Sequence, residues 1–116
     1  MDKMEELCQL VNNKYIQSFS WERQYILEED LLRTNVILVL MPSLNYLEEK
    51  CLKVTFYGVS DLKYYGLDST IFSLAIMIED IRYRHWENCR YFVHGVEDEF
   101  SLYCSEFDHE WITISK

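Results

Sequence analysis

The stretch that decides the fold is residues 89–107, CRYFVHGVEDEFSLYCSEF. Its halves, residues 89–96 and 99–107, alternate apolar and polar side chains around Glu97 and Asp98, which is the pattern of a β-hairpin. Pairing across that turn gives one apolar face: Cys89, Tyr91, Val93, Phe100, Leu102 and Cys104. The other face collects Arg90, Phe92, His94, Ser101, Tyr103 and Ser105. A two-residue and a four-residue turn give the same two faces, so either register predicts this hairpin.

Further strands are predicted on both sides of this hairpin. Residues 35–41 are rich in Val, Ile and Leu and end at Pro42, which is typical of a strand buried on both faces. Residues 51–57 and 71–80 alternate, as strands with one buried face do. Residues 111–114 provide a candidate final strand.

Two segments before these strands have helical spacing. Residues 2–14 place apolar side chains at helical intervals behind an acidic first turn, so they predict a short helix. Residues 21–27 are ambiguous, because Trp21, Tyr25 and Leu32 would also fit one face of a helix.

These elements predict an α+β fold, with an N-terminal helix followed by an antiparallel β-sheet meander of about six strands. The prediction includes a sheet that is strongly curved or barrel-like. The chain shows no repeat and no linker rich in Gly, Ser or Pro. We therefore expect a single domain over residues 1–116.

The net charge of the chain indicates which kinds of molecule it attracts and which it repels. The formal net charge is −9, so the chain repels phosphate backbones and anionic lipids, and we expect neither nucleic acid nor a membrane as its partner. A basic protein would be attracted, although the same charge would also serve solubility alone. The start of the chain has no apolar signal segment, and its four cysteines form no CxxC pair. We expect a cytoplasmic protein with reduced cysteines.

No motif in the chain predicts catalysis, a metal or a cofactor. Cys104 and His94 are the candidate nucleophile and general base, but strand alternation places them on opposite faces of the hairpin. His85, His94 and His109 lack the spacing of metal ligands. We therefore expect a protein that is not an enzyme and that needs no cofactor.

An acidic run with interleaved aromatic residues is the candidate partner-binding site. No Lys or Arg interrupts it from Glu97 to Glu110, and Tyr103, Phe107 and Trp111 lie within or next to it. Carboxylates around exposed aromatic side chains suit a basic protein surface, because charge speeds encounter and aromatic anchors supply contact energy. The alternative is a solvated acidic end with its aromatic side chains turned inward. The predicted site residues are Glu97, Asp98, Glu99, Tyr103, Glu106, Asp108 and Glu110.

Three stretches resemble a group of known proteins. They are LKVTFYGVSDL at residues 52–62, IEDI at residues 78–81 before Trp86 and Glu87, and FSLYC at residues 100–104. In these stretches the chain resembles small uncharacterised bacterial proteins, many of them similar to immunity proteins of polymorphic toxin systems. The resemblance implies a cytosolic protein that binds and blocks a cognate toxin, often through an acidic surface that faces a basic nuclease.

Three functions therefore compete. The first is a non-catalytic protein-binding module, an immunity-like inhibitor of a basic toxin. The second is a structural or assembly subunit that forms a homodimer through an open sheet edge. The third is a ligand-binding domain or small enzyme with a pocket roofed by Trp86 or Trp21.

Overall fold

The computed structural model describes residues 2–12, 14–42, 50–64, 73–85, 89–96 and 100–113. In chain order, the elements are α1 (Lys3–Val11), β1 (Lys14–Ile26), β2 (Leu31–Met41), β3 (Lys50–Tyr57), β4 (Ser60–Tyr64), β5 (Ser73–Leu74), β6 (Ile76–Asp80), β7 (Tyr91–Gly95), β8 (Phe100–Cys104) and β9 (Glu106–Thr113). Short 3-10 turns cover Leu27–Glu29 and Arg82–Arg84.

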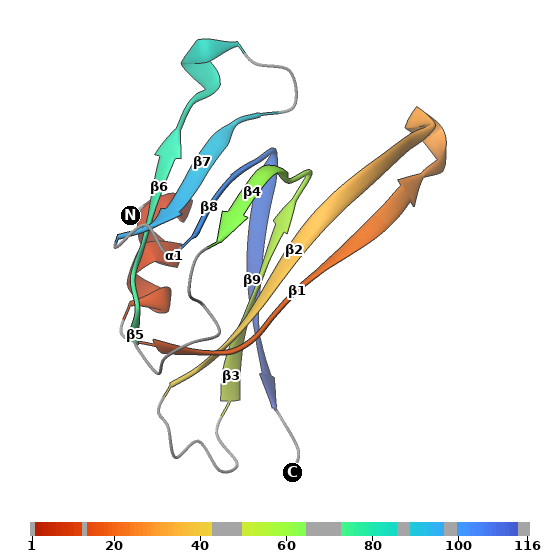
Figure 1. The fold of residues 1–116 in the computed structure, drawn as a ribbon. Helices are drawn as coiled ribbons and strands as arrows, with labels where there is room; N and C mark the ends of the chain where they lie inside the picture. The colour runs from red at the N-terminus through yellow and green to blue at the C-terminus, as the bar shows by residue number, and fades with distance from the viewer. Residues whose placement is uncertain are drawn as a thin grey trace.

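The strands form two antiparallel sheets. The first sheet has the order β5-β1-β2-β3-β9 and the second has the order β4-β8-β7-β6. Figure 1 shows α1 beside the second sheet, and the β1–β2 hairpin extending away from the rest of the molecule. The helix and the antiparallel sheets confirm the predicted α+β class. The single meander of about six strands is wrong, because the described residues contain nine strands in two sheets. A barrel-like sheet is not confirmed.

The two sheets arise because the chain crosses between them at short breaks. The predicted strand over residues 99–107 is divided at Ser105, with β8 in the second sheet and β9 in the first. Ser105 donates two hydrogen bonds to the carbonyl oxygen of Tyr57, from its amide at 2.9 Å and from its hydroxyl at 3.0 Å. A second crossing follows β3 at Gly58, and a third follows β5 at Ala75. Breaks of this kind let one chain build the corner between two packed sheets.

The core fills the space between the sheets. The first sheet contributes the even-numbered side chains of β2 and β3, which include Val36, Leu38 and Phe56. The second sheet contributes the face predicted for the C-terminal hairpin, and its register pairs Tyr91 with Cys104 and Val93 with Leu102. Leu7 and Val11 of α1 join the same buried cluster, which consists of Leu7, Val11, Val36, Leu38, Leu40, Leu52, Val54, Phe56, Ile76, Val93, Phe100, Leu102, Cys104 and Phe107.

The two segments with helical spacing have different structures. The N-terminal helix forms, with the Asp2 carboxylate accepting a hydrogen bond from the Glu5 amide at 2.8 Å, and it ends at Val11. Residues 21–27 belong mainly to β1, because pairing with β2 satisfies their backbone groups. Among the described residues, no helix combines the length and apolarity needed to cross a lipid bilayer.

The crossing at Gly58 generates a stability prediction. Gly58 has a φ of +64°, and a Cβ there would lie 2.6 Å from the Ser105 hydroxyl oxygen. We expect Gly58→Ala to lower the free energy of unfolding by about 1–3 kcal/mol, from backbone strain and this clash together. Urea denaturation measures the change.

Making Gly58→Ala in a chain that also carries Ser105→Ala separates the effect of backbone strain from the effect of the clash. Ser105→Ala removes the clashing oxygen and leaves the positive φ in place. Gly58→Ala should therefore cost less stability in the Ser105→Ala background than in the natural chain. Equal costs in both backgrounds would show that the close packing of Gly58 on Ser105 does not hold the corner.

Candidate partner-binding surface

Three of the predicted acidic residues form a row on β9. Glu106, Asp108 and Glu110 alternate along the strand and point to the face opposite the core, beside Tyr57, Thr55 and Lys53 of β3. Glu110 lies 3.5 Å from the Lys53 ammonium, and both side chains are solvent-accessible, so this ion pair contributes little stability. In the described part of the chain β9 is the edge of its sheet, where charged side chains discourage pairing with other strands. We name Glu106, Asp108 and Glu110 the acidic row.

The structure separates Tyr103 from the acidic row. Tyr103 lies on β8 in the second sheet, with its ring centroid 4.9 Å from that of Phe92. The change of sheet at Ser105 thus divides residues that are close in sequence. Glu97, Asp98 and Glu99 lie outside the described residues.

The interleaved aromatic residues lie on the other face of β9. Phe107 is buried and its ring centroid lies 5.0 Å from that of Tyr91. Trp111 shares the Phe107 face but is exposed near the end of the strand, with the Lys14 ammonium 5.6 Å from its ring centroid. Phe107 and Trp111 therefore do not stand among the carboxylates of the acidic row, where Tyr57 of β3 is the neighbouring aromatic residue.

The cysteine and histidine candidates for chemistry do not meet. Cys104 is buried in the core face of β8, while His94 stacks on Phe92 on the opposite face of the sheet at 5.1 Å between ring centroids. Burial raises the pKa of the Cys104 thiol to about 12, which leaves it protonated at neutral pH. No group of three His, Cys, Asp or Glu side chains in the described ranges is arranged to hold a metal ion.

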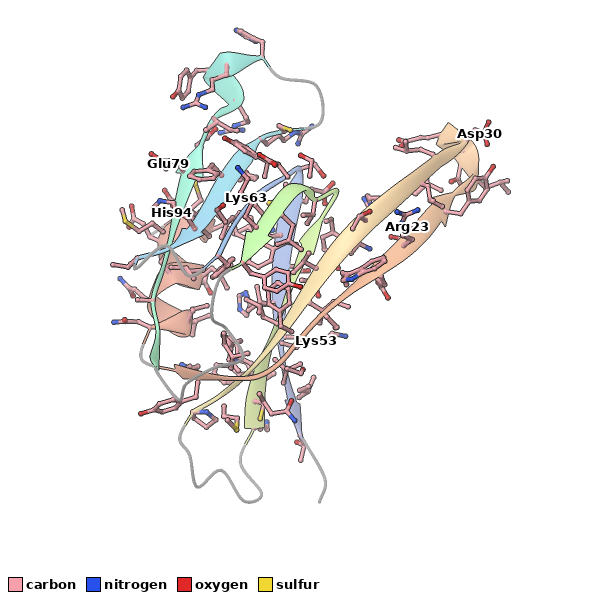
Figure 2. All side chains as sticks on the ribbon, in the orientation of Figure 1. Arg23, Asp30, Lys53, Lys63, Glu79 and His94 are labelled. Carbon is pink, nitrogen blue, oxygen red and sulfur yellow. The ribbon has the colours of Figure 1, made fainter. Side chains whose placement is uncertain are left out.

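A different surface stands out on the β1–β2 hairpin. Pairing between β2 and β3 covers Val36 to Leu40, whereas pairing between β1 and β2 continues outward to Ile26 and Leu31. Residues 20–34 therefore form a two-stranded ribbon beyond the sheet, which we name the distal hairpin. Figure 2 shows Asp30 at its tip and Arg23 along it, well away from Glu79 and His94.

The register gives the distal hairpin one apolar face. Trp21, Tyr25 and Leu32 share the face that, nearer the body, points into the core. Here the second sheet no longer covers it, and these side chains are 59%, 55% and 54% exposed. Arg23 lies between the two aromatic residues, with its guanidinium carbon 5.9 Å from the Trp21 ring centroid.

The opposite face braces the distal hairpin against the body. Asn35 is almost fully buried and donates hydrogen bonds to Gln24 at 3.2 Å and to Glu22 at 3.4 Å. Its side-chain oxygen accepts a hydrogen bond from the Gly58 amide at 3.4 Å. The Arg33 guanidinium lies 5.0 Å from the Tyr57 ring centroid and donates to Gln24 at 2.8 Å. The contacts with Gln24 and Glu22 join β1 to β2, and those with Gly58 and Tyr57 connect the ribbon to the body.

Two concave regions border the distal hairpin. A cleft of about 580 Å³ lies between the hairpin and the Gly58 corner, and Arg33, Arg90, Glu29 and Glu106 are among its lining residues. A groove of about 550 Å³ lies at the foot of the apolar face, lined by Ile16, Gln17, Ser18, Phe19, Trp21, Leu62 and Tyr64. Trp21 thus borders a groove, as one sequence interpretation expected, but none of the described residues that line it is a carboxylate, Lys, Arg or His. Trp86, the other expected roof, lies outside the described residues.

The distal hairpin is not predicted as a surface by its sequence pattern. Helical and strand spacing both place Trp21 and Tyr25 on one face, so the pattern could not show what covers them. The available signal was the alternation of Trp21, Arg23 and Tyr25, with acidic turn residues at 28–30.

Comparison with known proteins identifies a family that covers most of the chain. The family model described as immunity protein PIM8 matches residues 1–110. Neither the curated proteins nor the solved structures contain a match to the chain.

The burial of Cys104 generates a prediction about thiol reactivity. In the folded protein at pH 8 we expect iodoacetamide to modify Cys89 well before Cys104, because the Cys104 thiol is buried and almost entirely protonated. Cys89 is the internal control, since it is half-buried and lies 3.6 Å from the Ser60 hydroxyl. Peptide mass spectrometry follows both residues. Modification of Cys104 as fast as Cys89 would reveal an accessible nucleophile and contradict this assignment.

Proposed function

The chain belongs to the immunity protein PIM8 family, and we propose that it is a non-catalytic inhibitor that binds a cognate toxin domain and blocks its activity. The observation that carries this proposal is the family match, which covers residues 1–110 of 116. Supporting it, Cys104 and His94, the nucleophile and base pair suggested by the sequence, lie on opposite faces of a sheet. We further propose that the chain acts as one domain in the cytoplasm.

The charge of the chain favours a basic toxin. A net charge of −9 attracts a cationic protein over roughly one Debye length, about 8 Å at physiological salt. The acidic row supplies a local negative surface on β9. In the described part of the chain, Glu110 forms an ion pair with Lys53, and Glu106 lines the same cleft as Arg33 and Arg90. We propose that the acidic row, together with Glu97, Asp98, Glu99 and Tyr103 from the sequence analysis, guides this encounter. Charges of this kind act mainly on the association rate.

Co-expression tests the proposed function directly. The partner to use is the toxin domain encoded by the gene immediately upstream of the gene for this chain. We expect the protein to rescue growth of cells that express that toxin domain, and to elute with it as one complex in gel filtration. A gene neighbourhood without a toxin, or a toxin that kills cells equally with and without this protein, would contradict the proposal.

Charge reversal tests the role of the acidic row. We expect Glu106→Lys with Asp108→Lys to slow association with the toxin domain about tenfold at low salt, because steering by local charge is lost. The dissociation rate should change less. Stopped-flow mixing at several salt concentrations measures both rates.

The control variant changes the total charge equally at other places. Glu6 on α1 and Glu79 on β6 are exposed, so Glu6→Lys with Glu79→Lys alters the net charge by the same amount. We expect a smaller effect from this pair. Equal slowing by both pairs would mean that total charge, and not the acidic row, guides association. A third variant, Glu97→Lys with Asp98→Lys and Glu99→Lys, tests these three predicted site residues in the same assay.

A further inference from the structure

Exposed apolar side chains are concentrated on the distal hairpin. Among the described residues, ten large apolar side chains are exposed, and five of them lie between residues 21 and 32: Trp21, Tyr25, Leu27, Leu31 and Leu32. A soluble protein scatters such residues singly, whereas clusters with a polar border mark contact sites. Leu27 and Leu31 flank the acidic tip residues Glu28, Glu29 and Asp30.

We propose that the apolar face of the distal hairpin, with the groove at its foot, is the surface that anchors the toxin domain. This inference rests on the proposed function and identifies where the contact energy comes from. The complementary surface on the toxin is a cleft with an apolar floor and a basic rim. Trp21, Tyr25 and Leu32 contact the apolar floor of that cleft. The carboxylates of Glu28, Glu29 and Asp30, at the tip of the hairpin, contact its basic rim.

The shape of the hairpin supports a convex anchor. Residues 20–34 extend beyond the sheet and end in a tight 3-10 turn, so they can enter a cleft that the broader body cannot (Figure 1). The groove continues the same face toward the body, because Trp21 belongs to both. Phe19 and Tyr64 line this groove with their ring centroids 5.7 Å apart. The apolar surface is therefore continuous from the hairpin to the second sheet.

Hydrogen bonds within the distal hairpin and contacts with the body hold its conformation in the free chain. The Tyr25 hydroxyl donates a hydrogen bond to Asp30, and the Asp30 amide donates to the Leu27 carbonyl oxygen at 3.3 Å. Asn35 and Arg33 brace the opposite face against the Gly58 corner and Tyr57. Aromatic side chains on a braced ribbon lose little conformational entropy on binding, which favours slow dissociation.

The charges on the hairpin select a basic protein over a second copy of this chain. Residues 20–34 carry four carboxylates against two arginines, and three of the carboxylates sit together at the tip. A second copy would bring another chain with a net charge of −9 against this face. A basic rim compensates the carboxylates instead, and the exposed Trp and Tyr rings supply the contact types that dominate tight interfaces.

A paired substitution tests the anchor. We expect Trp21→Thr with Leu32→Thr to weaken binding of the upstream-encoded toxin domain about 100-fold, mainly through faster dissociation, and to abolish rescue of growth. Threonine keeps the β-propensity of both positions. Unlike the charge reversal on β9, the loss should persist at high salt.

The matched control removes exposed apolar side chains elsewhere. Met77 on β6 and Tyr83 in the following turn are 52% and 69% exposed. Strand β6 lies on the opposite side of the molecule from the tip of the distal hairpin (Figure 1). Met77→Thr with Tyr83→Thr should leave affinity and rescue unchanged. Circular dichroism and thermal unfolding verify that both variants fold.

A second measurement uses the hairpin without truncating it. A photo-crosslinking benzophenone in place of Tyr25 should capture the toxin domain on illumination, and the same group in place of Tyr83 should not. This measurement decides the question if the Trp21→Thr with Leu32→Thr variant unfolds. Capture from position 83 alone would overturn the inference.

The outcomes separate this inference from the proposed function. If the natural chain neither binds nor rescues, the proposed function is wrong and the anchor is wrong with it. If the natural chain binds and rescues, and the Trp21→Thr with Leu32→Thr variant does so equally well, the anchor alone is wrong. Sedimentation gives a third outcome. If the natural chain is a dimer, the variant is a monomer and the affinity for the toxin domain is unchanged, then a second copy of this chain covers the face.

Discussion

The structure depends on a difference in strand length: β1 and β2 are longer than the other strands that pair with them or pack on them. β1 and β2 have 13 and 11 residues, whereas β3 has 8 and the strands β7 and β8 of the second sheet have 5 each. Alternation gives β2 a core-facing side along its whole length, but the second sheet covers that side only near the body. Val36, Leu38 and Leu40 are consequently buried, while Leu32, on the same side, is half exposed to solvent. One hydrophobic pattern thus builds both the core and an uncovered apolar surface.

Local patterns predicted the C-terminal hairpin and the N-terminal helix, but they left residues 21–27 of the β1–β2 hairpin ambiguous. The C-terminal hairpin has the predicted faces, with Val93 opposite Leu102, because alternation places the same side chains on one face in every even register. The helix was likewise visible in its spacing and its acidic first turn. The change of sheet at Ser105 was not predictable, because it depends on Tyr57 and Gly58, which are distant in sequence. The strand over residues 99–107 therefore divides, and the single meander becomes two sheets.

The candidate partner-binding site was also predicted only in part, because the change of sheet at Ser105 divides it. Alternation predicts that Glu106, Asp108 and Glu110 share one face, and the pairing of β9 with β3 gives them that arrangement. Tyr103 precedes the change of sheet and packs on Phe92 instead. The apolar surface of the distal hairpin was beyond prediction, because exposure of Trp21 and Tyr25 depends on where the second sheet ends. Sequence periodicity identifies a face but not the element that covers it.

The two surfaces suit the two stages of capturing a toxin: charge acts at long range on encounter, and apolar contact acts at short range on residence time. Hydrogen–deuterium exchange, measured on the protein alone and in complex with the toxin domain encoded upstream, tests this account most directly. We predict slower exchange on binding in peptides that cover residues 20–34. Unchanged exchange there, with protection on β6 and β7 instead, would contradict it.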